Sequence, residues 1–247
     1  MLDAADVVRG SPATAPTRTM RSCPSRWNGR IPSGSSGTST RPSFGVSLTP
    51  GVADPPALLD ISRLPLDDIT ERPDGSLRLG ATGRNADTAA HPLVRRRYPV
   101  LARALLSGAS PQLRNLATNA GNLLQRTRCV YFQDVTTPCN KRTPGSGCSA
   151  VGGYTRYHAI LGASETCVAT HPSDMAVALT ALDARIVVQG PGGERVVDIG
   201  DFYRLPGEHP ERDTILEPHD VIVAIDVPPP LPDSSSTYRK VRDRRSY

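Results

Sequence analysis

The most constraining feature of this 247-residue sequence is a cluster of four cysteines in a stretch rich in proline and glycine. Cys129, Cys139, Cys148 and Cys167 fall close together, while the fifth cysteine, Cys23, stands far from them. An iron–sulfur cluster needs four thiolates that converge on one small cube, so the chain between the ligands must turn sharply. The intervening segment supplies such turns through its prolines and glycines, namely Pro138, Pro144, Gly145 and Gly147.

The spacing of these cysteines does not exclude zinc binding, disulfides or unlinked thiols. A zinc ribbon or knuckle favours two close cysteine pairs, whereas this spacing is wide, uneven and without a CxxC. Two disulfides would suit an exported protein, but residues 1–30 carry no apolar signal region. Unlinked thiols are a fourth possibility. The basic residues Arg128, Lys141 and Arg142 favour a cluster, because they would stabilise thiolates and offset a cluster's negative charge.

The first 50 residues differ in composition from the rest of the chain. They are a mixture of Ser, Thr, Pro and Arg without sustained helical or strand periodicity. Such a segment buries too little apolar surface to offset the entropy lost on ordering, so residues 1–50 are predicted to be a disordered tail. Periodic apolar patterns begin near Gly51.

From Gly51 onward the patterns predict a mixture of helices and strands that do not alternate strictly, which favours the α+β class. Turns are expected at Pro65 and at Asp74-Gly75. Helices are expected over 82–90, 98–106 and 171–184. Strands are expected over 58–61, through Leu77 and Leu79, in a hairpin of 185–190 and 194–199, and over 220–227 and 237–243.

The charge balance narrows the range of partners. The chain has 29 Lys+Arg against 24 Asp+Glu, a net charge of +5, which would attract nucleic acid or an anionic cofactor. The arginines are scattered, however, and no nucleic-acid motif or aromatic stripe accompanies them, so no nucleic-acid partner is expected. The sequence has no apolar run of about 18 residues, so no membrane span is expected either.

A turn of small residues, Thr118-Asn119-Ala120-Gly121-Asn122, follows a short helical segment. Its backbone amides, with the side chains of Thr118 and Asn122, are the kind of groups that bind an anion or a ring carbonyl. Most turns of this composition only redirect the chain. Likewise Asp174 is at the expected start of a helix, where it would ordinarily be a cap, and Lys240 would ordinarily be solvated.

Taken together, the strings SPQLRNLATNAGNLLQRTRC, CNKRTPGSGC, HAILGAS and HPSDMAVALTALDA resemble the FAD-binding subunit of the xanthine dehydrogenase/aldehyde oxidoreductase family of molybdenum hydroxylases. The cysteine stretch is similar to the branch of periplasmic aldehyde oxidoreductase flavoproteins, which carry an additional [4Fe–4S] cluster. The resemblance covers residues 51–247. It implies the two-part α+β FAD-binding domain of that family, with FAD and a [4Fe–4S] cluster as cofactors.

The resemblance also implies a role for individual residues. The cluster ligands would be Cys129, Cys139, Cys148 and Cys167. In the family an A-T-x-G-G-N turn contacts the flavin, and the matching residues here are Thr118, Ala120, Gly121 and Asn122, with Ala120 in place of a glycine. Asp174 would hydrogen-bond the cofactor, Ile222 would pack beside the isoalloxazine, and Lys240 would lie near it.

The sequence departs from the family at both ends. The family has an A-G-G-T-(N/D)-L loop near the N-terminus, whose amides hold the FAD pyrophosphate. No such loop occurs here, and the nearest string, Gly34 to Thr38, lacks the apolar helix that should follow. Residues 1–50 are therefore interpreted as aberrant or disordered, 51–230 as the FAD-binding domain with its iron–sulfur loop over 129–167, and 231–247 as the start of a truncated C-terminal domain.

The implied function is electron relay. A molybdenum cofactor-binding large subunit would oxidise an aldehyde or a purine-like substrate, and a small subunit with [2Fe–2S] centres would pass electrons to FAD in this chain, then to an external acceptor. The complex would be cytoplasmic, or periplasmic by co-export with a partner subunit. Two other hypotheses are a structural zinc protein without flavin, and a nonfunctional fragment that has lost FAD binding.

Overall fold

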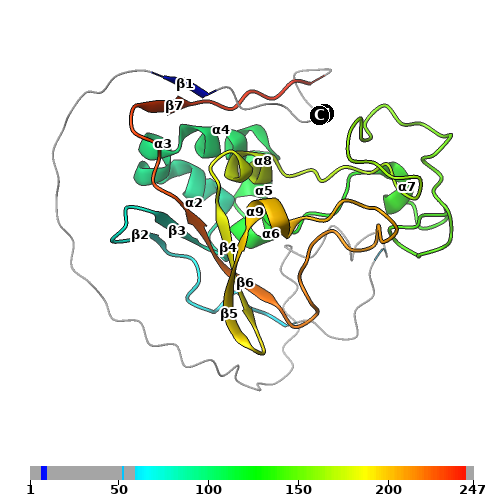
Figure 1. Cartoon of the computed structure of the whole chain (residues 1–247), viewed down its shortest axis with the longest axis horizontal. Helices are drawn as coiled ribbons and strands as arrows, with labels where there is room; N and C mark the ends of the chain where they lie inside the picture. The colour runs from blue at the N-terminus through cyan, green and yellow to red at the C-terminus, as the bar shows by residue number, and fades with distance from the viewer. Residues whose placement is uncertain (1–6, 10–51, 53–58, 243–247) are drawn as a thin grey trace.

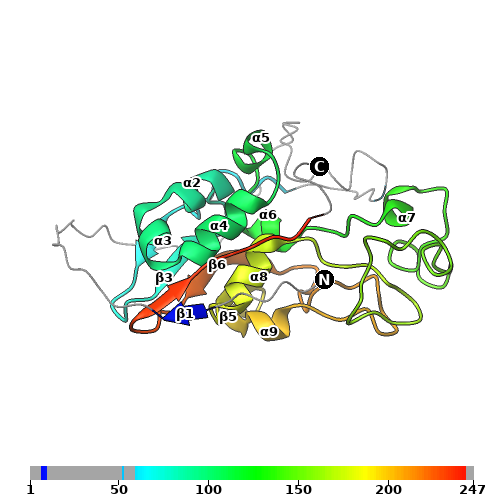
Figure 2. The ribbon, with the colours of Figure 1, turned by 90° about the horizontal axis from the view of Figure 1, so that it is seen from above.

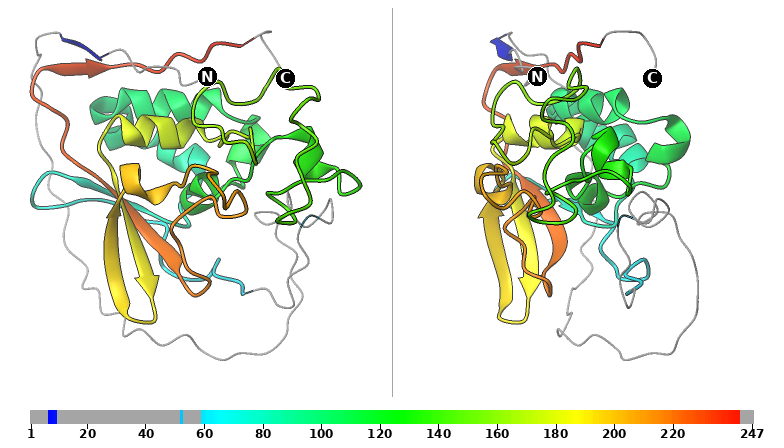
Figure 3. Two further views of the ribbon diagram at one scale, coloured as in Figure 1. Left: turned by 45° about the vertical axis from the view of Figure 1, so that its right-hand side comes forward. Right: turned by 90° about the vertical axis from the view of Figure 1, so that its right-hand side faces the viewer.

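The computed structural model describes Val7–Arg9, Val52 and residues 59–242 of the chain (Figure 1). Its body is one antiparallel sheet with a layer of helices packed on one side (Figures 1 and 2). A lobe made mostly of loops, which holds the cysteines and helix α7, extends beside this body (Figures 2 and 3). We refer to residues 129–168 as the cysteine lobe. The fold is α+β, as the sequence predicts.

The sheet has five strands in the order β2-β3-β6-β4-β5, and every neighbouring pair is antiparallel. The strands are β2 (Ile69–Glu71), β3 (Leu77–Gly80), β4 (Arg185–Gly190), β5 (Gly193–Asp198) and β6 (Val221–Val227). The turn at Asp74-Gly75, the hairpin at Pro191-Gly192 and the central strand β6 were predicted from the sequence and are confirmed, whereas strand β2, which completes a hairpin with β3, was not predicted. A second sheet pairs β1 (Val7–Arg9) with β7 (Ser234–Ser236).

Short helices, several of them started by proline, form the second layer, apart from α7, which lies in the cysteine lobe. They are α2 (Asn85–Ala90), α3 (Pro92–Arg97), α4 (Pro99–Ser107), α5 (Pro111–Arg114), α6 (Asn119–Leu123), α7 (Val130–Gln133), α8 (Asp174–Thr180) and α9 (Ile199–Phe202). Proline is favourable at the first position of a helix because its missing N–H has no intrahelical acceptor there. Among the described residues, no helix combines the length and apolar character needed to cross a bilayer.

Several expected elements differ in the structure. The expected helix over 98–106 is α4, but α3 was missed, since only Val94 of its six residues is buried and its apolar pattern is therefore weak. The expected helix over 171–184 is limited to α8. No strand forms over 59–61 or 237–242, while Leu58 and Asp243 lie outside the described residues, as does most of the tail predicted over 1–50.

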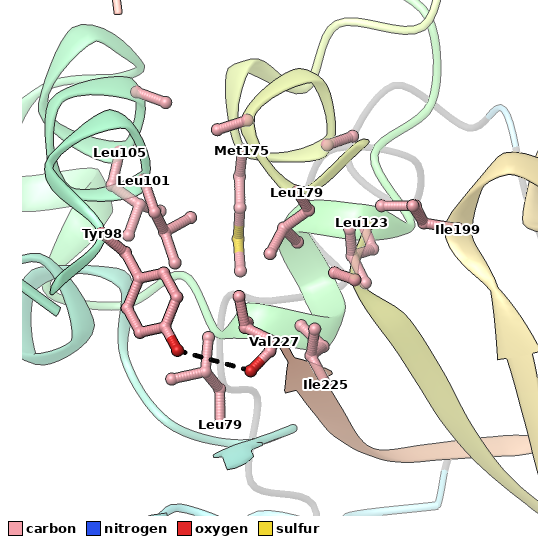
Figure 4. Close-up of a cluster of buried hydrophobic side chains, with 14 of the residues drawn as sticks. Leu79, Tyr98, Leu101, Leu105, Leu123, Met175, Leu179, Ile199, Ile225 and Val227 are labelled. Carbon is pink, nitrogen blue, oxygen red and sulfur yellow. Dashed lines mark hydrogen bonds between the residues drawn. The ribbon is translucent and has the colours of Figure 1, made fainter. Parts of the chain in front are cut away.

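The core lies between the helices and one face of the sheet (Figure 4). Tyr98, Leu101 and Leu105 of α3–α4 meet Met175 and Leu179 of α8 above the sheet, in the view of Figure 4. The sheet contributes alternate residues, as the two-residue period of a strand requires: Leu77, Leu79, Ile186, Val188, Ile225 and Val227. The Tyr98 hydroxyl, buried within this cluster, donates to the carbonyl oxygen of Pro228 at 2.9 Å.

A bulge in the pairing of β4 with β6 decides which residues of β6 reach this core. Val187 pairs with Ala224 but Val188 pairs with Ile222, so Val223 is the extra residue. In a regular strand, Ile222 and Ile225 would point to opposite faces of the sheet. The additional residue turns Ile222 to the core face, where Ile225 also lies. Ile222 consequently belongs to the core and is only 3% exposed.

Gly80 lies where β3 meets the segment that precedes β2. Its amide donates to the carbonyl of Asp68 at 2.8 Å, and a Cβ at this position would overlap the backbone carbonyl of Leu66. We expect Gly80→Ala to lower the free energy of unfolding by about 1–3 kcal/mol, because the backbone has to move apart. Urea unfolding measures this.

Gly192 in the β4–β5 turn is the matched control. A Cβ at Gly192 would meet no atom within 4 Å. Gly192→Ala should therefore change the free energy of unfolding by less than about 0.5 kcal/mol. Equal stability of the two variants would contradict the close packing at Gly80.

Candidate functional site

The four cysteines predicted as cluster ligands gather in the cysteine lobe, and all four are free thiols. Cys139 and Cys148 face each other in an isolated antiparallel bridge. Cys139 and Cys167 are buried, at 6% and 5% exposure, while Cys129 and Cys148 are half-buried. The structure therefore contains no disulfide among these four cysteines.

The electrostatic surroundings of the thiols show that they share one neighbourhood. Burial raises the pKa of Cys129, the amides of Phe132 and Tyr131 lower it, and Cys139 and Cys148 raise it again. Burial also raises the pKa of Cys167, an amide and Lys141 lower it, and the same two cysteines raise it. Cys139 and Cys148 therefore act on both other thiols, and four thiolates here would repel one another unless a cationic centre lay between them.

The spacing of the four thiols can be compared with that of a site for a single metal ion. A tetrahedral zinc has Zn–S bonds of about 2.3 Å, so its sulfur ligands lie within roughly 4 Å of one another. In the described part of the chain, no group of three or more His, Cys, Asp or Glu side chains is placed to hold one metal ion. A cluster binds each thiolate through a different iron and so accepts wider spacing. Four cysteine thiols are a donor set that a [4Fe–4S] cluster can use.

Hydrogen bonds from side chains, rather than the backbone hydrogen bonds of a sheet, hold the cysteine lobe together. The Arg142 guanidinium donates to the carbonyls of Tyr131, Phe132 and Thr137, so it closes the end of α7 onto the loop. Asn140 donates to the carbonyl of Thr166 at 3.0 Å and accepts from the amide of Gly147 at 2.8 Å. These contacts connect the segments that carry all four cysteines.

A buried lysine joins the cysteine lobe to the segment that follows α9. The Lys141 side chain is 7% exposed, forms an ion pair with Asp213 and donates to the carbonyl of Pro210 at 2.6 Å. Arg126 forms a second ion pair with Asp213, Nε to Oδ2, at 2.6 Å. Asp213 is thus the shared counter-charge of two cations at the base of the lobe.

The small-residue turn of the sequence forms the start of α6, where Thr118 is the N-cap. Its Oγ1 accepts from the amide of Gly121 at 3.1 Å. The amides of Asn119, Ala120 and Asn122 donate to the carbonyls of Gly83, Ala81 and Thr118, so all four amides of the turn are already satisfied within the chain. Side chains and the exposed backbone at Gly121, where a Cβ would lie 2.9 Å from Thr118 Oγ1, are what remain for a ligand.

Asn122 connects this turn to the start of α8. Its Oδ1 accepts from the Ser173 hydroxyl at 2.7 Å and from Gln125 at 2.8 Å, and its Nδ2 donates to Asn85 at 2.6 Å. Ser173 in turn caps α8 by accepting from the amide of Ala176 at 2.9 Å. The turn and the helix start are therefore held in fixed relation.

Asn119 is a positioning residue that the sequence did not single out. It is fully buried, accepts from Thr88 at 3.0 Å and donates to the carbonyl of Gly80 at 3.0 Å. A buried amide costs free energy unless its donors and acceptor are satisfied. Its neighbour in the turn, Asn122, was predicted because it matches a motif, whereas Asn119 has no signal in the sequence beyond its place in that motif.

The structure brings Asp174 and Lys240 into direct contact. Lys240 Nζ lies 2.6 Å from Asp174 Oδ2, and the Tyr238 hydroxyl donates to Oδ1 at 2.6 Å. A Cβ at Gly108 would lie 3.2 Å from the same carboxylate, so glycine leaves room for it. Both predicted residues therefore lie beside the start of α8, one residue from the contact between Ser173 and Asn122.

Ile222 is placed differently. Its side chain is buried in the core opposite Val188, not on the surface shared by the turn and Asp174. The contact predicted between Ile222 and an isoalloxazine therefore stays a prediction.

A cavity of about 600 Å³ lies between α6 and the segment that follows α9. Leu123, the last residue of α6, and Leu124, which follows it, line one side of the cavity. Arg126 and Asp213 line the side that faces the cysteine lobe. His171 also faces it, with Nε2 3.0 Å from the carbonyl oxygen of Leu123, and burial lowers the pKa of this imidazole. The cavity thus separates the turn from the base of the cysteine lobe.

Comparison with known proteins assigns the class. Residues 39–230 match the family described as the FAD binding domain in molybdopterin dehydrogenase, and the chain belongs to this family. The fold is similar to that of a carbon monoxide dehydrogenase chain from Hydrogenophaga pseudoflava, in a form that lacks the Mo-pyranopterin moiety. The TM-score is 0.56 at 24% identity, over 82% of this chain and 54% of the other.

Curated relatives refine the comparison. The chain is 56% identical over 197 residues to the aldehyde oxidoreductase FAD-binding subunit PaoB of Escherichia coli (strain K12), covering 79% of this chain and 62% of that protein. It is 28% identical over 173 residues to the putative xanthine dehydrogenase FAD-binding subunit XdhB of the same organism, covering 70% and 43%. The chain therefore spans about two fifths to three fifths of the length of these relatives.

The ion pair at the base of the cysteine lobe gives a testable consequence. Asp213→Asn leaves the Lys141 ammonium buried without its counter-charge, and we expect this to destabilise the lobe by about 2 kcal/mol. Limited proteolysis should then cleave within 129–168 faster than in the parent chain.

Two variants complete this test. Asp198→Asn, which removes an exposed ion pair with Arg185, should leave the cleavage rate unchanged. Adding Lys141→Met to Asp213→Asn should recover much of the loss, because no buried charge then remains. Unaltered proteolysis of Asp213→Asn would show that the pair does not hold the lobe.

Proposed function

We propose that this chain is the electron-transfer flavoprotein and iron–sulfur subunit of a molybdenum hydroxylase of the aldehyde oxidoreductase type. The observation that carries the proposal is the gathering of four free thiols in one lobe of a chain that belongs to an FAD-binding family. The identity of 56% to an aldehyde oxidoreductase FAD-binding subunit supports the aldehyde type over the xanthine type.

The cluster would be held by Cys129, Cys139, Cys148 and Cys167. Two of these thiols are buried, and backbone amides lower the pKa of Cys129 and Cys167, which favours sulfur that carries negative charge. A [4Fe–4S] cluster supplies one-electron transfer when bound. The protein's part is to hold the sulfurs at fixed positions and to exclude water from the buried pair.

FAD would be held by the surface that joins the turn to the start of α8. Thr118 and Asn122 would donate hydrogen bonds, Ala120 and Gly121 would allow close approach, and the contact between Asp174 and Lys240 would orient one edge of the cofactor. FAD supplies the conversion between two-electron and one-electron transfer when bound. Lys240, whose side chain is 32% exposed, would place positive charge beside it.

The proposed route joins this chain to two partners. A molybdenum cofactor-binding large subunit would oxidise the substrate, and a [2Fe–2S] small subunit would deliver the electrons to FAD here, in a heterotrimer. An external acceptor would receive them. The assembly would work in the cytoplasm, or in the periplasm after co-export with a partner subunit.

Iron content and absorption test the proposal directly. This chain, purified anaerobically without the [2Fe–2S] small subunit, should contain four irons and one FAD per chain and show a flavin band over a broad iron–sulfur shoulder. A colourless protein that contains zinc would support a structural metal site instead. Aggregated protein whose thermal transition does not rise with added FAD would indicate a fragment that has lost its function.

Replacing one ligand should remove the cluster. Cys148→Ser takes away one of four thiolates, so we expect iron to fall from about four per chain to below one, measured after anaerobic purification. Cys23→Ser changes a cysteine outside the cysteine lobe and should keep full iron content. Four irons per chain in Cys148→Ser would be evidence against the assignment.

Asp174 should matter for the flavin and not for iron. Asp174→Asn keeps the shape of the side chain but removes the charge that holds Lys240, so we expect FAD occupancy to drop at least several-fold while iron content stays at the parent value. Flavin released by heat and measured by fluorescence gives the occupancy. Asp198→Asn is the control, and parent-like FAD content in Asp174→Asn would refute the role.

A further inference from the structure

One side chain reaches a proposed cluster ligand from a distant part of the cysteine lobe. His158 Nε2 lies 3.1 Å from Cys129 Sγ, across 29 residues of sequence. The backbone on both sides of His158 is fixed: its own amide donates to the carbonyl of Thr155 at 3.0 Å, and the amide of Ala159 donates to the carbonyl of Val168 at 2.8 Å. Because Val168 follows Cys167, the imidazole is positioned by the segment that carries the fourth cysteine.

The surroundings of the imidazole decide which nitrogen carries the hydrogen. Nδ1 is buried and has no hydrogen-bond partner among the described residues. A neutral imidazole has one N–H, and a buried N–H without an acceptor costs more than an unpaired lone pair. The hydrogen therefore belongs on Nε2, facing the sulfur. A thiolate bound to iron can only accept, which requires the same tautomer.

Cys129 Sγ thus collects donors. The amides of Tyr131 and Phe132 lower the pKa of this thiol, although the Phe132 amide donates to the Cys129 carbonyl at 3.1 Å, and His158 adds a side-chain contact to the sulfur itself. Hydrogen bonds to the sulfurs of an iron–sulfur cluster stabilise the more negative, reduced form and so raise its reduction potential. The corner of the cluster at Cys129 is where this protein would concentrate that effect.

We propose that His158 is a positioning residue for the cluster, which donates from Nε2 to the Cys129 thiolate and raises the reduction potential. The inference rests on the proposed [4Fe–4S] cluster but adds to it a residue that is not a ligand. It assigns to the HAILGAS string, of which His158 is the first residue, a role in tuning electron transfer.

Potentiometric titration of the holo-complex, followed by electron paramagnetic resonance of the reduced cluster, tests the inference. His158→Leu removes the donor, so the equilibrium for reduction should become several-fold less favourable, with iron content unchanged. His158→Gln keeps an N–H donor and should retain most of the parent potential. His219→Gln, an exposed position outside the cysteine lobe, is the control. A potential in His158→Leu equal to that of the parent overturns the inference.

A second measurement uses the parent protein alone and does not depend on how the variants fold. In protein labelled with ¹⁵N-histidine, electron–nuclear double resonance of the reduced cluster should show a weak nitrogen coupling, together with an exchangeable proton. A strong coupling would make His158 an iron ligand, and no coupling would place it away from the sulfur; either result overturns the inference. If the parent contains no cluster, the proposed function itself fails, which iron analysis shows separately.

Discussion

The repulsion among four sulfur atoms held in one loop is the constraint on which the rest of the cysteine lobe depends. Cys139 and Cys148 both disfavour the thiolate forms of Cys129 and Cys167, so the loop cannot hold four bare thiolates at low cost. The proposed iron centre would offset this repulsion and would bring binding free energy to a lobe with little regular structure. The contacts of Arg142, Lys141 and Asn140 give the loop its shape around that centre.

The turn of residues 118–122 is held in shape by a different kind of interaction. Here the backbone amides are already used within the chain, and buried amide side chains, not charges, determine the geometry. Asn119 ties the turn to β3, and Asn122 ties it to the start of α8, where Asp174 meets Lys240. The base of the cysteine lobe adjoins α6 across the cavity that Leu123 and Arg126 line. One body therefore presents the two surfaces proposed to hold cofactors on neighbouring elements.

The sequence predicted the strands and turns whose formation depends on residues near one another in the chain. The hairpin of β4 and β5 and the strand β6 were predicted because two-residue periodicity and a glycine turn are read within a few residues. Helix α3 was missed because its polar residues outnumber its single buried one. The strands expected over 58–61 and 237–243 follow β-like patterns, but the described residues there have no neighbouring strand to pair with.

The site shows the same division. The four cysteines were predicted as a set because they lie close together in the sequence, and the structure places them in one lobe. The contact of Asp174 with Lys240 spans 66 residues, and that of His158 with Cys129 spans 29, so no local pattern reports them. Asn119 and Asn85 resemble ordinary turn and cap residues until the partners that bury them are known.

The central claim is that all four cysteines share one iron–sulfur centre. Diffraction from crystals of the anaerobically purified protein, collected at wavelengths on both sides of the iron absorption edge, tests it most directly. A shared centre should give one compact anomalous peak of four irons, bounded by Cys129, Cys139, Cys148 and Cys167. Iron density absent from the lobe, or a single ion held by fewer than four of these sulfurs, would contradict it.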